Sequence, residues 1–164
     1  MKILENYKVP SDSETIKTEV VCPNDTNPMG LLQGGRLVQW MDIAAAVCAQ
    51  THSEKICVTA CINDVEFNSS AKIGDIIDIS ANITRAFTTS MEIFVQAFAR
   101  EVLTGKKYLI SEAYFIFVAL DENRKATPVM GVKPLTSMEK ELYDRALNRK
   151  SGKELFKNRI NISK

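Results

Sequence analysis

Helical spacing of apolar residues is clearest over residues 35–51, whose length and residue types suit one long helix. One side of that helix carries the apolar residues Leu37, Met41, Ala44, Ala45 and Cys48. The opposite side is hardly more polar, because Asp42 is the only formally charged residue between Arg36 and Glu54. A helix that is apolar nearly all round is normally enclosed by the rest of its fold. We therefore expect a helix buried by the remaining chain.

After this helix the pattern changes to strict alternation, which is typical of half-buried strands. The clearest case is residues 76–87, where one face carries Ile77, Ile79, Ala81 and Ile83. Similar strands are expected at 15–22, 56–67, 90–101 and 107–120. A turn at Thr104-Gly105 suits a hairpin between the last two strands. Strands of ten or more residues exceed the usual ~5–6 and normally curve.

One buried helix and a run of long antiparallel strands predict an α+β fold, in which a curved sheet wraps around the helix. A second helix is expected after Pro134, with Thr136 or Ser137 as its cap and Gly152 as its stop. The chain is thus divided into a domain of residues 1–134 and a C-terminal helix with a basic tail, residues 135–164. The basic residues of that tail could attract phosphates or could simply be solvated.

Composition narrows the class of protein. The 164 residues are 45% hydrophobic and 25% charged, as in an ordinary one-domain globular protein. A net charge of +1 argues against a surface shaped for nucleic acid. The N-terminus lacks the apolar stretch of a secretory signal, and no run approaches the ~20 apolar residues of a membrane span. We expect a cytoplasmic protein with no membrane insertion.

Cysteine and histidine usage gives little support for a metal site. The chain has a single histidine, His52, and no CxxC spacing among Cys22, Cys48, Cys57 and Cys61. We expect all four cysteines to be reduced and mostly buried, with Cys57 and Cys61 on one face of a strand.

Asp42 is the strongest local sign of chemistry, because an ionised carboxylate in apolar surroundings costs several kcal/mol unless it is compensated. Its helical neighbours Ala45, Ala46 and Ala49 leave room for a ligand or another chain. The alternative is an exposed helix face or a structural hydrogen bond. Upstream, Gly34 and Gly35 stand where the helix begins, so unpaired N–H groups could meet a developing oxyanion. Turns also use such glycine pairs routinely.

The string DTNPMGLLQGGRLVQWMDIAAA, residues 25–46, resembles the bacterial YciA-type and mammalian brain-type acyl-CoA hydrolases. The resemblance covers about residues 15–130. It continues, in order, through VTA at 58–60, IGD at 73–75, TTSMEI at 88–93 and AYFIFVAL at 113–120. It implies a single hotdog domain that hydrolyses acyl-CoA to free fatty acid and CoA. No metal or redox cofactor is implied, and coenzyme A takes part only as a portion of the substrate.

The resemblance also implies where the site lies. In the enzymes it resembles, two hotdog domains pair, as dimers or as dimers assembled into trimers. Carried over here, Asn27 and Gly35 of one subunit would face Asp42 of the other. Asp42 would be general base or nucleophile, Asn27 would orient water or the carbonyl, and the Gly35 N–H would stabilise the oxyanion. Gln33 departs from the His or Phe of several relatives and bears on pocket polarity.

Further substrate contacts are expected around this centre. Gly34 and Gln33 lie at the helix start, and Thr59 on the following strand either approaches the site or is structural. For CoA, the resemblance points to the turn and strand start at Thr88, Thr89 and Ser90, which would meet the phosphates, with Lys72 and Arg85 as charge partners.

Two other functions remain possible from the sequence. A hydroxyacyl dehydratase of the same fold resembles a pattern with histidine early in the helix, whereas His52 lies at its far end. A non-catalytic acyl-CoA-binding or lipid-sensing hotdog module is the other alternative. Regulators of that kind carry a DNA-binding segment, and we expect too few residues before the first strand for a helix-turn-helix.

Overall fold

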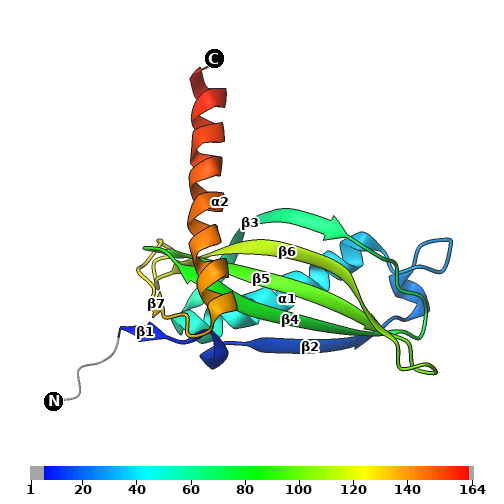
Figure 1. Ribbon diagram of the computed structural model, residues 1–164. Helices are drawn as coiled ribbons and strands as arrows, with labels where there is room; N and C mark the ends of the chain where they lie inside the picture. Colours follow the sequence, from blue (N-terminus) through cyan, green and yellow to red (C-terminus); the bar gives the residue numbers. More distant parts are fainter. Residues whose placement is uncertain (1–5, 163–164) are drawn as a thin grey trace.

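The computed structural model describes residues 6–162, with side chains described up to residue 151. A curved five-stranded antiparallel sheet wraps around helix α1, Gly34–Ser53 (Figure 1). The spatial order of its strands is β2 (Thr15–Val20), β4 (Ile76–Ala86), β5 (Ser90–Arg100), β6 (Lys107–Leu120) and β3 (Ile56–Phe67). This is the α+β hotdog arrangement, so the predicted fold class is confirmed.

The core lies between α1 and the concave face of the sheet. The alternation in β4 is confirmed, since Ile77, Ile79 and Ala81 are fully buried. The side of α1 predicted to be apolar is also buried against the sheet, as shown by Leu37, Met41, Ala44, Ala45 and Cys48. The hairpin between β5 and β6 turns at Gly105, whose φ of +69° favours glycine.

One side of α1 is left uncovered by its own chain, which corrects the expectation of a fully enclosed helix. Ile43 and Val47 are 44% and 45% exposed. Strand β3, beside this side of the helix, forms an edge of the sheet and exposes Ile56, Val58 and Phe67. We call the exposed side of α1 together with β3 the open face. An apolar surface of this kind marks an interaction site.

A bulge in β3 corrects the expectation for the cysteines. The register with β6 shifts between Thr59 and Cys61, so Cys57 lies opposite Ala119 but Cys61 lies opposite Ile116. Directly opposed residues share a face, and the inserted residue therefore turns Cys61 to the other face from Cys57.

None of the four cysteines forms a disulfide bond, and the expectation that most of them are buried is wrong. Only Cys48 is fully buried, whereas Cys22 and Cys61 are exposed. Burial raises the pKa of the Cys48 thiol to about 12.

Before the C-terminal part, β7 (Gly131–Val132) pairs in parallel with β1 (Tyr7–Lys8) from near the other end of the chain. Helix α2, Ser137–Ile162, follows and runs through Gly152, so the predicted stop is wrong. A lone glycine inside a helix costs only about 1 kcal/mol and does not have to end it. The expected cap is confirmed, because the Glu139 N–H donates to the Thr136 hydroxyl at 3.1 Å and the Thr136 N–H donates to the Glu139 carboxylate at 2.9 Å.

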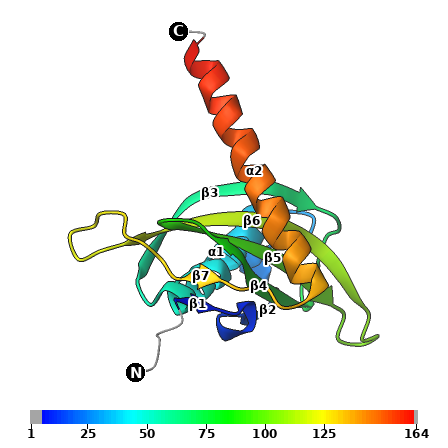
Figure 2. The ribbon, with the colours of Figure 1, turned by 60° about the vertical axis from the view of Figure 1, so that its left-hand side comes forward.

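Helix α2 crosses the convex face of the sheet and projects beyond it (Figure 2). Its first half is not a solvated tail, since Arg149 pairs with the buried Glu92 of β5. The predicted basic residues beyond 151 lie outside the described side chains, and the division at residue 134 stays a prediction. Within the described chain, no helix combines the length and apolarity needed to cross a membrane.

Candidate active site

Asp42 occupies the middle of α1 on the open face, where it is half-buried. The Thr59 hydroxyl of β3 donates a hydrogen bond to Asp42 Oδ1 at 2.7 Å. Of the predicted small neighbours, Ala45 and Ala49 are buried and Ala46 is half-buried. Thr59 thus orients the carboxylate directly, on a side of the helix that a ligand or a second chain can approach.

The start of α1 presents unpaired backbone N–H groups. Gln33 precedes the helix, but its side chain makes no capping bond and its amide donates to the Thr26 carbonyl at 2.8 Å. The first bond of the helix runs from the Leu37 N–H to the Gln33 carbonyl. A Cβ added to Gly35 would meet nothing within 4 Å, so the chain's own packing does not require glycine there.

Asn27 lies in the loop before α1 and has its carbonyl oxygen fully engaged. Its Oδ1 accepts hydrogen bonds from the Met29 N–H at 2.9 Å and the Leu31 N–H at 3.2 Å. The loop closes on the same residue through the Asn27 N–H, which donates to the Leu31 carbonyl at 2.8 Å. The side-chain amide NH2 makes no hydrogen bond within the described residues. This arrangement makes Asn27 a donor toward a carbonyl oxygen.

Within one chain, the Asp42 carboxylate lies far from the N–H groups at the start of α1. Gly35 and Asp42 are seven residues apart on α1, which places them on the same side of the helix but about 10 Å apart along its axis. Attack on a thioester requires the base near the attacking water and the oxyanion donors about 3 Å from the carbonyl oxygen. Within one chain, Asp42 and the Gly35 N–H are therefore too far apart to act on the same carbonyl group.

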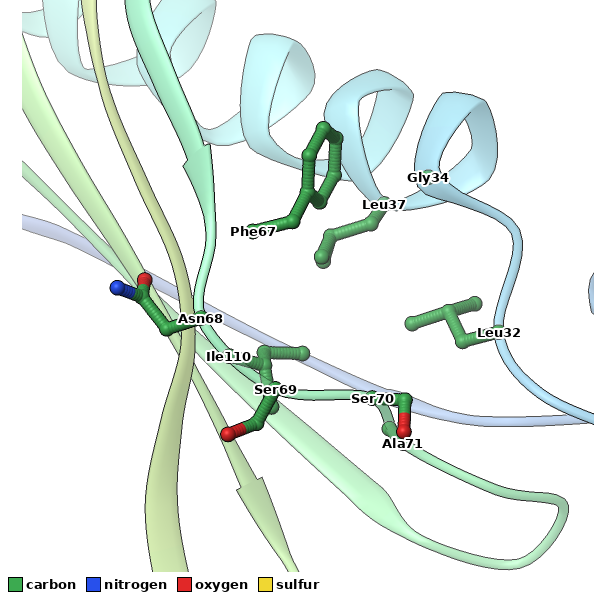
Figure 3. A pocket seen from close by; sticks show the side chains of 9 residues that line it. All are labelled: Leu32, Gly34, Leu37, Phe67, Asn68, Ser69, Ser70, Ala71 and Ile110. Carbon is green, nitrogen blue, oxygen red and sulfur yellow. The ribbon is translucent and has the colours of Figure 1, made fainter.

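A cavity of about 410 Å³ opens beside the helix start (Figure 3). Its lining comes from the loop before α1, the first turn of α1, the end of β3 with the segment after it, and one residue of β6. These residues are Leu32, Gly34, Leu37, Phe67, Asn68, Ser69, Ser70, Ala71 and Ile110. Apart from Gly34, none of these residues was predicted to line the site. The segment after β3 shows no periodicity, and only its packing in the fold brings it beside α1.

The residues predicted to bind CoA are not brought together within one chain. Thr88 and Thr89 lie in the turn between β4 and β5, and Ser90 begins β5. Lys72 precedes β4 at its other end, roughly 30 Å away along the strand. Arg85 is engaged elsewhere: its guanidinium donates to the Tyr143 carbonyl at 3.0 Å and stacks on the Tyr143 ring at 3.9 Å. Their roles toward CoA stay predictions.

His52 is fully buried at the far end of α1, two to three turns beyond Asp42. Its Nε2 bonds the Met130 carbonyl at 3.1 Å, and burial lowers its pKa. The described residues contain no group of three His, Cys, Asp or Glu side chains placed to hold a metal ion.

The thioesterase superfamily matches residues 29–106 of the chain. An uncharacterized acyl-CoA thioester hydrolase of Bacillus subtilis, YkhA, is 35% identical over 138 residues, which are 84% of this chain and 80% of YkhA. The chain also matches the acetyl-coenzyme A thioesterase of Mus musculus at 32% identity, covering 90% of this chain but only 27% of the mouse protein. It thus spans about a quarter of that relative.

Solved structures give the same result. An apo-hexameric acyl-CoA thioesterase is 38% identical, with a TM-score of 0.88 over 90% of this chain and 95% of that one. The Staphylococcus aureus acyl-CoA hydrolase, solved with butyryl coenzyme A, coenzyme A and coenzyme A disulfide, is 36% identical, with a TM-score of 0.84 over 95% and 98% of the two chains. It was also solved with an aspartate, an asparagine or a threonine replaced by alanine.

Proposed function

Because the chain belongs to the acyl-CoA hydrolases of the thioesterase superfamily, we propose that it hydrolyses fatty acyl-CoA to free fatty acid and CoA in sites shared between two subunits. The observation that carries this proposal is the position of Asp42. It is a carboxylate oriented by Thr59 on an open face, about 10 Å along the helix from the N–H groups that would complete its site.

The Staphylococcus aureus enzyme supports the choice of residues. Its substituted asparagine, aspartate and threonine have the same order and spacing along the chain as Asn27, Asp42 and Thr59. Thr59 contacts Asp42 in the present structure, and Asn27 lies in the loop that leads into α1. The three residues therefore form a consistent set of carboxylate, orienting hydroxyl and amide donor.

The open face supports a shared site. Antiparallel pairing of β3 with β3 of a second copy would cover its exposed apolar residues and the Ile43 and Val47 side chains of α1. The same two-fold pairing runs the two helices in opposite directions, so the start of one helix approaches the middle of the other. Dimers of this kind could assemble into hexamers like the apo-hexameric relative.

In the proposed reaction Asp42 either removes a proton from the attacking water or attacks the thioester carbonyl itself. The negative charge that develops on the carbonyl oxygen would be met by the Gly35 N–H and the Asn27 amino group of the partner subunit. The C–S bond then breaks and CoA leaves as the thiolate. If water attacked, the free fatty acid is formed directly; if Asp42 attacked, the acyl group is left as an anhydride on Asp42, which water then hydrolyses to the fatty acid and the restored carboxylate. The carboxylate and donors suffice for this chemistry.

Asp42→Asn tests the carboxylate. The substitution keeps the shape of the side chain but removes its basicity, so thiol release from acyl-CoA should fall by about 10²–10⁴. Asp144→Asn, an exposed residue on α2, is the matched control and should keep full activity. Full activity in Asp42→Asn would contradict the proposal. Binding of acyl-CoA without thiol release by the unaltered protein would favour the non-catalytic acyl-CoA-binding or lipid-sensing module.

Subunit complementation tests the sharing of the site. Asn27→Ala and Asp42→Asn each impair both sites of a homodimer, but a mixed dimer has one site with both residues intact. Co-expression with two affinity tags isolates that mixed dimer. It should recover up to half of the unaltered activity. Activity that stays at the level of the two parent variants would place each site within one chain.

A further inference from the structure

The cavity beside the start of α1 has a backbone fixed on two sides. The N–H groups of Asn68 and Ser69 donate to the Ile110 carbonyl of β6 at 2.9 and 3.5 Å. On the other side, the Leu32 N–H donates to the Ala71 carbonyl at 2.8 Å. The cavity is therefore held open between β6 and the loop that carries Asn27. Its shape is a property of the folded chain rather than of a loose surface loop.

The inner wall of the cavity is apolar and buried, and its outer wall is one aromatic ring. Leu37, Ile110 and Ala71 are each at most 3% exposed, whereas Phe67 is 58% exposed. The Phe67 ring stands against the first turn of α1 (Figure 3), where a Cβ added to Gly34 would lie 3.1 Å from it. The side chain of Phe67 thus closes the cavity next to the N–H groups of the helix start.

From this arrangement we propose that the cavity receives the alkyl chain of the acyl group and that Phe67 determines the chain length that fits. This inference rests on the proposed function. Gly34 lines the cavity and is bonded to Gly35, so an acyl carbonyl held at the Gly35 N–H has its alkyl chain at the cavity mouth. A saturated hydrocarbon matches the inner wall, because Leu37, Ile110 and Ala71 offer it no polar side chain. The polar residues of the lining, Asn68, Ser69 and Ser70, all belong to the segment after β3.

Two substitutions should move the preferred length in opposite directions. Phe67→Ala removes the outer wall and lengthens the preferred chain, while Ala71→Val narrows the inner wall and shortens it. Each methylene that gains or loses a place in the cavity should change kcat/KM about fourfold. Phe98→Ala is the matched control, because it removes the same ring from the convex face of β5, where Phe98 lies near Lys107.

The experiment measures kcat/KM by thiol release for acetyl-, butyryl-, hexanoyl-, octanoyl-, lauroyl- and palmitoyl-CoA. The expected result is an optimum shifted to longer chains in Phe67→Ala, to shorter chains in Ala71→Val, and unmoved in Phe98→Ala. If the unaltered protein is active and both cavity variants keep its optimum, the assignment of the cavity is overturned and the proposed function stands. If the unaltered protein hydrolyses none of these substrates, both proposals are overturned.

Discussion

Replacing Arg149 with Met should loosen α2, because it strips a buried carboxylate of its cation. Glu92 is 1% exposed, and its two oxygens accept hydrogen bonds from Arg149 Nε at 3.0 Å and Nη2 at 2.6 Å. The Thr84 hydroxyl donates to the same carboxylate at 2.7 Å and would be its remaining partner. The guanidinium also stacks on the Tyr114 ring at 3.8 Å, a contact that Met replaces in part.

The size of the stability loss depends on whether α2 stays docked over the uncompensated Glu92 charge or detaches from the sheet. Removing one member of a buried ion pair typically costs about 3–5 kcal/mol, because the other charge is left uncompensated. The Arg149 side chain is 17% exposed, so water screens the pair somewhat and the lower end of that range applies. If α2 detaches, water reaches Glu92 and the loss is limited to the docking free energy of the helix. We therefore expect a loss of roughly 2–3 kcal/mol.

The free energy of unfolding in urea measures this loss, and limited proteolysis of α2 shows whether the helix detaches. Arg145→Met is the matched control, since its ion pair with Glu141 is 64% and 57% exposed and is worth at most about 1 kcal/mol. A second substitution, Glu92→Met in the Arg149→Met background, should restore most of the stability. Equal losses in Arg149→Met and Arg145→Met would refute the reasoning.

Three further predictions concern stability, catalysis and assembly. Because burial lowers the pKa of His52, its imidazole binds a proton more tightly in the unfolded chain than in the folded one. The free energy of unfolding should therefore fall as pH drops below 6.5, and it should fall less steeply in His52→Gln. Thr59→Val should lower kcat about tenfold with little change in KM, while Thr59→Ser keeps the hydroxyl and the rate. Val47→Lys on the open face should give monomers by light scattering and lose activity, whereas Leu147→Lys on α2 should not; unchanged assembly in Val47→Lys would contradict the proposed interface.

Periodicity predicted the helix and all five sheet strands because each is long enough to repeat its pattern several times. β4 illustrates this, since four alternating apolar positions fix which face is buried whatever the strand packs against. The bulge after Thr59 escaped prediction, because a single inserted residue leaves no trace in composition and appears only in the register with β6. The pair β1 and β7 also escaped, since two-residue strands have no period.

Site residues could be predicted where a single side chain is energetically unusual for its surroundings, and could not be predicted where segments far apart in the sequence meet. Asp42 could be selected because a charge in an apolar helix requires an explanation. Glu92 could not be selected in the same way, because an acidic residue at a polar position of an alternating strand is expected to face solvent. Only α2, which brings Arg149 from 57 residues away, buries it. The cavity behind Phe67 is a similar case, because its walls come from four separate parts of the chain.

The open face connects stability with catalysis. Gly35, Asp42, Ile43 and Val47 project from the same half of α1, so the surface that carries the carboxylate also exposes apolar side chains to water. Covering that surface with a second copy would bury Ile43 and Val47 and bring oxyanion donors to Asp42 in one step. In the single subunit the carboxylate lies at a surface and accepts its hydrogen bond from Thr59. In the proposed pair the same carboxylate would face substrate. The apolar helix can therefore carry a charge at its centre, because that position lies at the surface of the single subunit rather than in its core.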